Sequence, residues 1–216
     1  MKICGINSPE AADAAASAGA DYAGLVFFPH SPRVVSPEQA ASLAARLRGR
    51  CRIVALTVDA TDPELEIVVR ACRPDFLQLH GRESPERVAV IRHRFNLPMV
   101  KAIAVAVAND LAPVLAYEQV ADILLFDAKT PVGAERPGGR GTAFDWQLLR
   151  GRKFSRPWLL AGGLNAENVA RAVRASDAPG VDCSSGVETA PGVKDAGLIR
   201  TFIAAARASQ FADAQA

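Results

Sequence analysis

The sequence lacks the features that would place it in a membrane or in an oxidising compartment. No uninterrupted apolar run approaches the roughly 20 residues needed to cross a bilayer, and no early stretch has the charged-then-apolar shape of a signal peptide. The four cysteines, Cys4, Cys51, Cys72 and Cys183, show no CxxC spacing. We therefore expect a cytoplasmic protein with reduced thiols and no membrane role.

A marked excess of one charge is also missing. The chain has 25 Lys and Arg against 23 Asp and Glu, and its basic residues are scattered along helix faces, so we expect no nucleic-acid partner. The histidines His30, His80 and His93 fall on separate elements without ligand spacing, which predicts no metal. The glycine-rich segments match neither a dinucleotide fingerprint nor a P-loop, so no cofactor is expected.

Aromatic residues are few, at 6% of the chain, whereas half of its 216 residues are hydrophobic. The core must therefore be aliphatic, as in parallel sheets that are buried on both faces. Eight short apolar runs alternate with helical patterns. The predicted strands are Lys2–Cys4, Tyr22–Phe28, Arg52–Val58, Phe76–Leu79, Met99–Ala104, Asp122–Asp127, Trp158–Gly162 and Val181–Ser184.

Helix starts are marked by a repeated signal, in which a capping residue is followed by proline and glutamate. It occurs at Ser8-Pro9-Glu10, Ser36-Pro37-Glu38, Asp62-Pro63-Glu64 and Ser84-Pro85-Glu86. Eight strands separated by capped helices favour right-handed crossovers and a closed sheet. We predict an α/β fold, a single-domain (βα)8 TIM barrel with a closed parallel eight-stranded sheet over residues 1–207, and a frayed C-terminal tail at 208–216.

In such a barrel, chemistry gathers at the C-terminal ends of the strands. The last two predicted strands end in Gly162-Gly163 and Ser184-Ser185-Gly186, which have little bulk. Bare backbone N–H groups at these junctions, each at the positive end of a following helix, would form a phosphate cradle. The alternative is that the glycines serve only tight turns.

Two titratable groups are predicted to face one another across the barrel mouth, Cys4 on the first strand and Asp127 on the sixth. By geometry they form an acid and base pair. For Cys4 to act as a base its pKa must fall, and the helix that begins near Ser8 or a cationic neighbour would lower it. A buried structural cysteine is the alternative. Asp127 follows an apolar wall that can raise its pKa, or it is held ionised by Lys129.

Further polar residues are expected near the mouth. Arg33, on a proline-flanked loop, can clamp a carboxylate with two parallel hydrogen bonds, or it is an exposed loop arginine. His80 is expected to contact a ligand or to form a structural hydrogen bond. Residues 133–141 are a candidate lid. These features indicate cofactor-free proton transfer on a small phosphorylated substrate.

Longer motifs run along nearly the whole chain in order. They are Lys2-Ile3-Cys4-Gly5-Ile6, Gly24-Leu25-Val26-Phe27, Ser31-Pro32-Arg33, Gln78-Leu79-His80-Gly81, Asp127-Ala128-Lys129-Thr130-Pro131, Gly138-Gly139, Phe144-Asp145-Trp146, Leu160-Ala161-Gly162-Gly163-Leu164-Asn165, Glu167-Asn168-Val169, Ser184-Ser185-Gly186-Val187-Glu188 and Pro191-Gly192-Val193-Lys194-Asp195. In combination and spacing, they resemble the phosphoribosylanthranilate isomerase family of tryptophan biosynthesis. Cys183 stands where relatives carry an aliphatic residue, and we expect it to fill the core.

The resemblance implies an Amadori rearrangement of N-(5-phosphoribosyl)anthranilate to 1-(2-carboxyphenylamino)-1-deoxyribulose 5-phosphate. Asp127 would be the general acid that protonates the furanose ring oxygen, and Cys4 the general base that takes the C2′ proton. Arg33 would hold the anthranilate carboxylate. The remaining expected substrate contacts are His80, Asp182 and, at the phosphate, backbone N–H groups around Gly141, Gly162, Gly163, Ser184 and Ser185. The protein would act as a monomer or homodimer.

Other assignments remain open at this point. Indole-glycerol-phosphate synthase, ribulose-phosphate epimerase and the histidine-pathway isomerase are also phosphate-binding barrels, and the last would place an aspartate where Cys4 stands. A non-catalytic barrel that binds a phosphorylated metabolite is the alternative from another class, because fold alone does not determine function.

Overall fold

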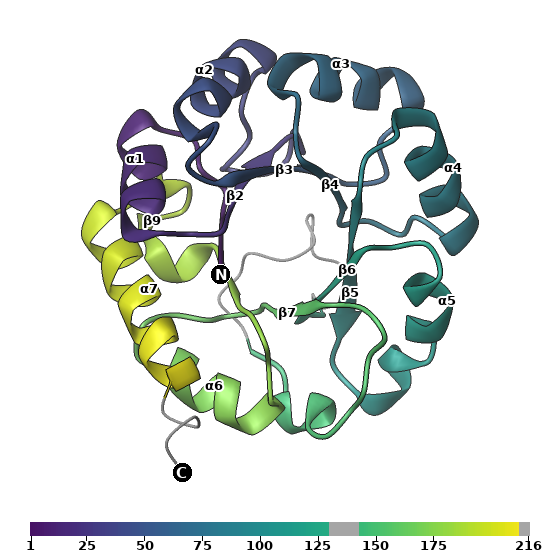
Figure 1. Cartoon of the computed structure of the whole chain (residues 1–216), viewed down its shortest axis with the longest axis vertical. Helices are drawn as coiled ribbons and strands as arrows, with labels where there is room; N and C mark the ends of the chain where they lie inside the picture. The colour runs from purple at the N-terminus through teal and green to yellow at the C-terminus, as the bar shows by residue number, and fades with distance from the viewer. Residues whose placement is uncertain (130–142, 212–216) are drawn as a thin grey trace.

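Eight parallel strands form a barrel surrounded by helices in the computed structural model, which describes residues 1–129 and 143–211 (Figure 1). The strand order is β7-β6-β5-β4-β3-β2-β1-β8, and a parallel bridge between Leu160 and Val181 joins the two ends of this sheet. The predicted TIM barrel is therefore confirmed. In Figure 1 the strands ring the centre and the helices form the outer layer.

All eight predicted strands are present, with ends that move by no more than two residues. They are β1 (Lys2–Cys4), β2 (Tyr22–Val26), β3 (Arg52–Thr57), β4 (Phe76–Leu79), β5 (Met99–Val105), β6 (Ile123–Ala128), β7 (Trp158–Leu160) and β8 (Asp182–Cys183). The α-helices of the described ranges are α1 (Pro9–Ala18), α2 (Pro37–Leu47), α3 (Asp62–Cys72), α4 (Pro85–Phe95), α5 (Val114–Glu118), α6 (Val169–Ser176) and α7 (Ala196–Phe211).

Three of the four expected helix caps are confirmed. The side-chain oxygens of Ser8, Ser36 and Ser84 each accept a hydrogen bond from the backbone N–H three residues later, at 3.2 to 3.3 Å. The fourth was assigned to the wrong residue. Thr61 precedes α3, and its backbone N–H donates to the Glu64 carboxylate at 2.7 Å, so Asp62 is already the first helical residue.

The last two strands are not followed at once by helices, which corrects the sequence prediction. After β7, α6 begins only at Val169. After β8 come a short 3-10 helix, η3 (Ser185–Val187), and a two-stranded hairpin of β9 (Glu188–Ala190) and β10 (Val193–Lys194), and α7 begins after these. Helix α7 then continues to Phe211, four residues beyond the predicted end of the barrel.

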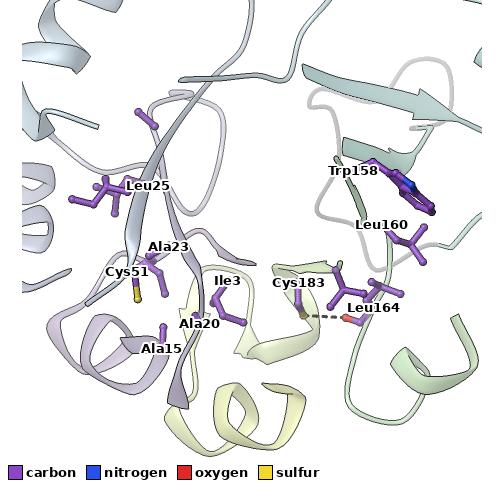
Figure 2. Packing of buried hydrophobic residues seen from close by; sticks show 14 of the residues in the cluster. Ile3, Ala15, Ala20, Ala23, Leu25, Cys51, Trp158, Leu160, Leu164 and Cys183 are labelled. Atoms are coloured by element: carbon purple, nitrogen blue, oxygen red, sulfur yellow. Dashed lines mark hydrogen bonds between the residues drawn. The ribbon is translucent and has the colours of Figure 1, made fainter. Parts of the chain in front are cut away.

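Apolar side chains fill both faces of the sheet. On the outer face, Ile3 and Cys183 lie buried between the strands and the helices, and the Cys183 thiol donates to the Leu164 carbonyl at 3.1 Å (Figure 2). The expectation that Cys183 fills the core is confirmed. Inside the barrel, an aliphatic and aromatic cluster includes Val54, Phe76, Val100, Ile123 and Leu125. This apolar filling leaves the C-terminal ends of the strands as the place for polar chemistry.

Candidate active site at the C-terminal end of the barrel

Cys4 is the last residue of β1, and its thiol points into the barrel beside Val26 and Leu56. It is buried, with 5% of its surface exposed. Gly24 is its partner on β2, and a Cβ atom on Gly24 would lie only 3.0 Å from the Cys4 sulfur. A glycine at this position therefore leaves room for the thiol.

Buried ion pairs surround Cys4 on the side of β1 and β8. The Lys2 ammonium lies 3.0 Å from the Asp182 carboxylate, and the Lys2 side chain is fully buried. The Lys194 ammonium lies 2.7 Å from Glu188, and these side chains are 0% and 4% exposed. Asp182 was predicted to contact substrate, and that contact stays a prediction because its observed partner is Lys2.

Burial raises the pKa of Cys4 above its usual value, although Lys2 and Lys194 act in the opposite direction through their positive charges. The expected cationic neighbours are thus present. The expected net fall in the pKa is not, because the cost of burying a thiolate outweighs the effect of these cations. The sequence could not show how deeply the thiol is buried.

Asp127 lies on β6 in a set of neutral hydrogen-bond donors. Its Oδ2 is 3.2 Å from His80 Nε2, and its Oδ1 accepts from the Ala128 N–H at 2.8 Å. The Gln78 amide donates to His80 Nδ1 at 2.9 Å, which leaves the His80 proton on Nε2, facing Asp127. The alternative that Lys129 holds Asp127 in a salt bridge is wrong, because Lys129 pairs with Asp110 at 2.6 Å.

Arg33 is buried, with 5% of its surface exposed, so the exposed-loop alternative is wrong. Its Nε and one terminal nitrogen each donate to Glu188 at 2.7 Å. Gly5 lies against the arginine chain at a φ of +78°, and a Cβ there would approach Arg33 Cδ to 2.5 Å. Arg33 is therefore fixed at the end of β1, close to Cys4.

The two predicted phosphate loops lie together. A Cβ on Gly186 would come within 1.9 Å of the Leu164 carbonyl oxygen, so only glycine allows this approach. Among the described residues, the N–H groups of Gly162, Gly163 and Ser184 donate to no backbone carbonyl. Bare donors of this kind suit an anion.

Gly162 brings the loop after β7 next to Asp127. A Cβ on Gly162 would lie 3.2 Å from Asp127 Oδ1, so the loop passes directly beside this carboxyl group. Ser185 opens η3 on the other loop. Gly141 and the candidate lid at 133–141 lie outside the described residues, apart from which every predicted site residue belongs to this end of the barrel.

Four side chains of the site were not assigned a role from the sequence, namely Lys2, Gln78, Glu188 and Lys194. For Lys2 and Gln78 a signal exists. Side chains alternate along a strand, so Lys2 shares the inner face with Cys4, and Gln78 shares it with His80. Glu188 and Lys194 come from a hairpin that the hydrophobic periodicity of the sequence did not predict, which is why their roles were missed.

The described residues hold no group of three or more His, Cys, Asp or Glu side chains arranged for a metal ion. Nor is any helix in the ranges 1–129 and 143–211 long and apolar enough to span a membrane. The described site brings a thiol and a carboxyl group, both able to exchange protons with a bound molecule, beside loops with bare backbone N–H groups.

Comparisons with known proteins agree with this geometry. Residues 1–205 match the family model for N-(5'phosphoribosyl)anthranilate (PRA) isomerase. An N-(5'-phosphoribosyl)anthranilate isomerase from Rhodopseudomonas palustris (strain BisA53) is 56% identical over 210 residues, which cover 97% of this chain and 96% of the relative.

Solved structures show the same relationship. The phosphoribosyl anthranilate isomerase of Thermotoga maritima is 37% identical with a TM-score of 0.86, covering 96% of this chain and 98% of that one. Another solved structure of a phosphoribosyl anthranilate isomerase, in complex with reduced 1-(o-carboxyphenylamino)-1-deoxyribulose 5-phosphate, is 34% identical with a TM-score of 0.81, covering 96% of this chain and 97% of that one. The chain therefore belongs to the phosphoribosylanthranilate isomerase family.

Proposed function

We propose that this protein converts N-(5-phosphoribosyl)anthranilate to 1-(2-carboxyphenylamino)-1-deoxyribulose 5-phosphate in tryptophan biosynthesis. The observation that carries the proposal is the placement of Cys4 and Asp127 on β1 and β6, at one end of the barrel beside the glycine loops. Family membership over residues 1–205 supports the same reaction. So does the relative that binds a reduced form of this product.

Asp127 acts first, as the general acid. It gives its proton to the furanose ring oxygen, the bond between C1′ and that oxygen breaks, and a Schiff base forms. The carboxylate that remains is stabilised by the His80 Nε2–H and the Ala128 N–H, which already point at its two oxygens. Gln78 fixes the histidine tautomer that this requires.

Cys4 acts next, as the general base. As a thiolate it takes the proton from C2′, and the electrons of that C–H bond move toward the Schiff-base nitrogen to give an enolamine. The enolamine then tautomerises to the ketone. Val26 and Leu56 exclude water around the sulfur, so the neighbouring ammonium groups of Lys2 and Lys194 must support the thiolate.

The substrate carries two anionic ends, and each has a matching region. The bare N–H groups of Gly162, Gly163 and Ser184 bind the phosphate. Arg33 binds the anthranilate carboxylate and shares its guanidinium with Glu188. The Arg33 guanidinium is held in place by two hydrogen bonds to Glu188. The substrate is thus held by its ends across the two proton carriers.

The test follows the loss of freshly made phosphoribosylanthranilate by its fluorescence. We expect the parent protein to consume it, and Cys4→Ser and Asp127→Asn each to lower kcat by about 10²- to 10⁴-fold, the usual contribution of one acid or base. The matched controls are Cys51→Ser and Asp177→Asn. Cys51 directly precedes β3, at the N-terminal end of that strand, and Asp177 directly follows α6, so both variants should retain parental activity.

A folded parent that binds the product analogue without consuming substrate would support the alternative, a barrel that only binds a phosphorylated metabolite. Variants that turn over as well as the parent would refute the assigned roles. Calorimetric binding of the analogue, measured on the same preparations, separates these two outcomes.

We further propose that the protein works in the cytoplasm as a monomer or homodimer. All four cysteines are buried and free of disulfide bonds, which suits a reducing compartment. Cell fractionation tests the compartment, and sedimentation equilibrium tests the oligomeric state.

A further inference from the structure

We propose that Lys2, held in place by Asp182, is the positioning residue that lets the buried Cys4 give up its proton. The catalytic meaning of this inference rests on the proposed function. The arrangement of charges around Cys4 does not rest on the proposed function, because the titration described below tests it without substrate.

The first step is the placement of the lysine. Lys2 and Cys4 are two residues apart on β1, so both side chains point into the barrel. Lys2 is 0% exposed, and its ammonium lies 3.0 Å from Asp182, its partner in the register of β1 and β8. The ammonium of a lysine buried in this way is not in contact with bulk water, and its charge acts on its neighbours within the barrel.

The second step is the charge count around the sulfur. The charged groups of the described residues that gather here are Lys2 on β1, Arg33 after β2, Asp182 on β8, Glu188 on β9 and Lys194 on β10. From β2 and β3 the neighbours are Gly24, Val26 and Leu56, which carry no charge. Three cations thus face two carboxylates. A Cys4 thiolate would lie among these ammonium groups, and Lys2 and Lys194 favour the charged form of the thiol.

The third step is the opposite action of the two partners. Burial raises the pKa of the Cys4 thiol, Lys2 lowers it through charge and a hydrogen bond, and Asp182 raises it. In return, the pKa of Lys2 is raised above its usual value by Asp182 and by Cys4, despite the cost of burial. The pair therefore keeps Lys2 charged beside the thiol.

Stability alone gives little reason for such a pair. Two charges taken from water into a protein interior lose about as much in solvation as they regain in attraction, and an apolar pair of similar size is often as stable. A lysine buried beside Cys4 is better explained by the anion that it supports.

The experiment measures thiolate formation at Cys4 directly, by far-ultraviolet absorbance during an alkaline titration. Each variant is compared with the same variant carrying Cys4→Ser, so that the other three thiols cancel. Lys2→Met should raise the titration midpoint by about 1 to 3 pH units, the usual effect of removing an opposite charge at this range. Asp182→Asn should lower it. Where a titration is incomplete, the fraction of Cys4 present as thiolate at one fixed alkaline pH ranks the variants in the same order.

A matched control breaks a buried ion pair elsewhere. Lys101 on β5 lies 2.8 Å from Glu83, with both side chains 3% exposed, and neither residue acts on Cys4. Lys101→Met should lower thermal stability and leave the Cys4 titration unchanged. This separates a loss of charge beside the thiol from a general loosening of the barrel.

The proposal is overturned if Lys2→Met titrates like the parent, or if Lys2→Met and Asp182→Asn shift the midpoint in the same direction. If Lys2→Met does not fold, Asp182→Asn decides alone, and an unchanged or higher midpoint refutes the proposal. In the isomerase assay, the pH at which kcat rises should move with the thiol midpoint. Absence of activity would refute the proposed function and leave the thiol titration to judge this inference.

Discussion

The two sides of the active site are built differently. Around Cys4, on β1 and β8, buried ammonium, guanidinium and carboxylate groups lie within ion-pair distance of one another. Around Asp127, on β6, the partners are the neutral donors His80 and the Ala128 N–H, and the nearest lysine in the sequence, Lys129, turns to Asp110.

This difference fits the roles proposed for the two groups. A thiol that has to become an anion in a buried place needs cations nearby, because burial alone favours the neutral form. A carboxyl group that has to deliver a proton needs the opposite, since a lysine salt bridge would hold it ionised. Neutral donors still stabilise the carboxylate once the proton has left.

After replacement of the two proposed proton carriers themselves, removal of Arg33 from the charged side should have the largest effect on activity. Arg33→Met should raise KM and lower kcat/KM by about 10- to 150-fold, which corresponds to the roughly 1.5 to 3 kcal/mol of a hydrogen bond to a charged group. Steady-state kinetics measures this change. Arg46→Met is the matched control, since Arg46 is an exposed arginine paired with Asp13. A loss confined to kcat would mean that Arg33 serves the thiol and not the carboxylate of the substrate.

Removing the neutral hydrogen-bond donors around Asp127 should reduce activity by a smaller factor. His80→Asn replaces the imidazole that faces Asp127 with a shorter side chain. We expect kcat to fall about 10-fold, as for the loss of one hydrogen bond of about 1 kcal/mol or slightly more. Gln78→Leu should have a smaller effect of the same kind, because Gln78 only orients the ring. His93→Asn, on the exposed face of α4, is the control. A shift of the Cys4 titration in His80→Asn would contradict the separation of the two sides.

Most of the fold could be read from the sequence because the signals were local. Alternating apolar runs and serine caps such as Ser8 and Ser84 give strands and helix starts, and eight repeats leave few topologies. The hairpin of β9 and β10 was missed because its strands are three and two residues long and mostly exposed. Their pairing depends on contacts with distant loops, such as Asn7 to the Gly192 carbonyl at 2.8 Å.

For the site, the sequence placed the two proposed proton carriers at strand ends but did not show their environment. Cys4 and Asp127 stand at strand ends, which topology brings to one end of the barrel. Which ions face them depends on distant partners. Arg33 and Glu188 are 155 residues apart, and Lys2 and Asp182 are 180 apart, so no local pattern links them. The net direction of the Cys4 pKa depends on burial, which only the packed structure reveals.

Removing Lys129 should give the smallest effect, and it is the sharpest test of the neutral side. Lys129 is half exposed, and its partner Asp110 has its pKa lowered to about 2, mainly by the hydrogen bond from Lys129. Lys129→Ala should therefore cost no more than about 1 kcal/mol of unfolding free energy at neutral pH, as is usual for surface pairs.

The pH dependence of that small cost has a definite sign. A carboxyl group whose pKa is lowered on folding contributes stability above its usual value of 3.8, and this contribution is lost as the pH falls toward about 2. Denaturant unfolding of the parent and Lys129→Ala should thus differ at neutral pH and converge in acid. Activity should stay within about two-fold of the parent, because a surface pair of this kind touches neither proton carrier. A large fall in kcat would mean that Lys129 acts on Asp127 during the reaction, and the contrast between a charged base side and a neutral acid side would then fail.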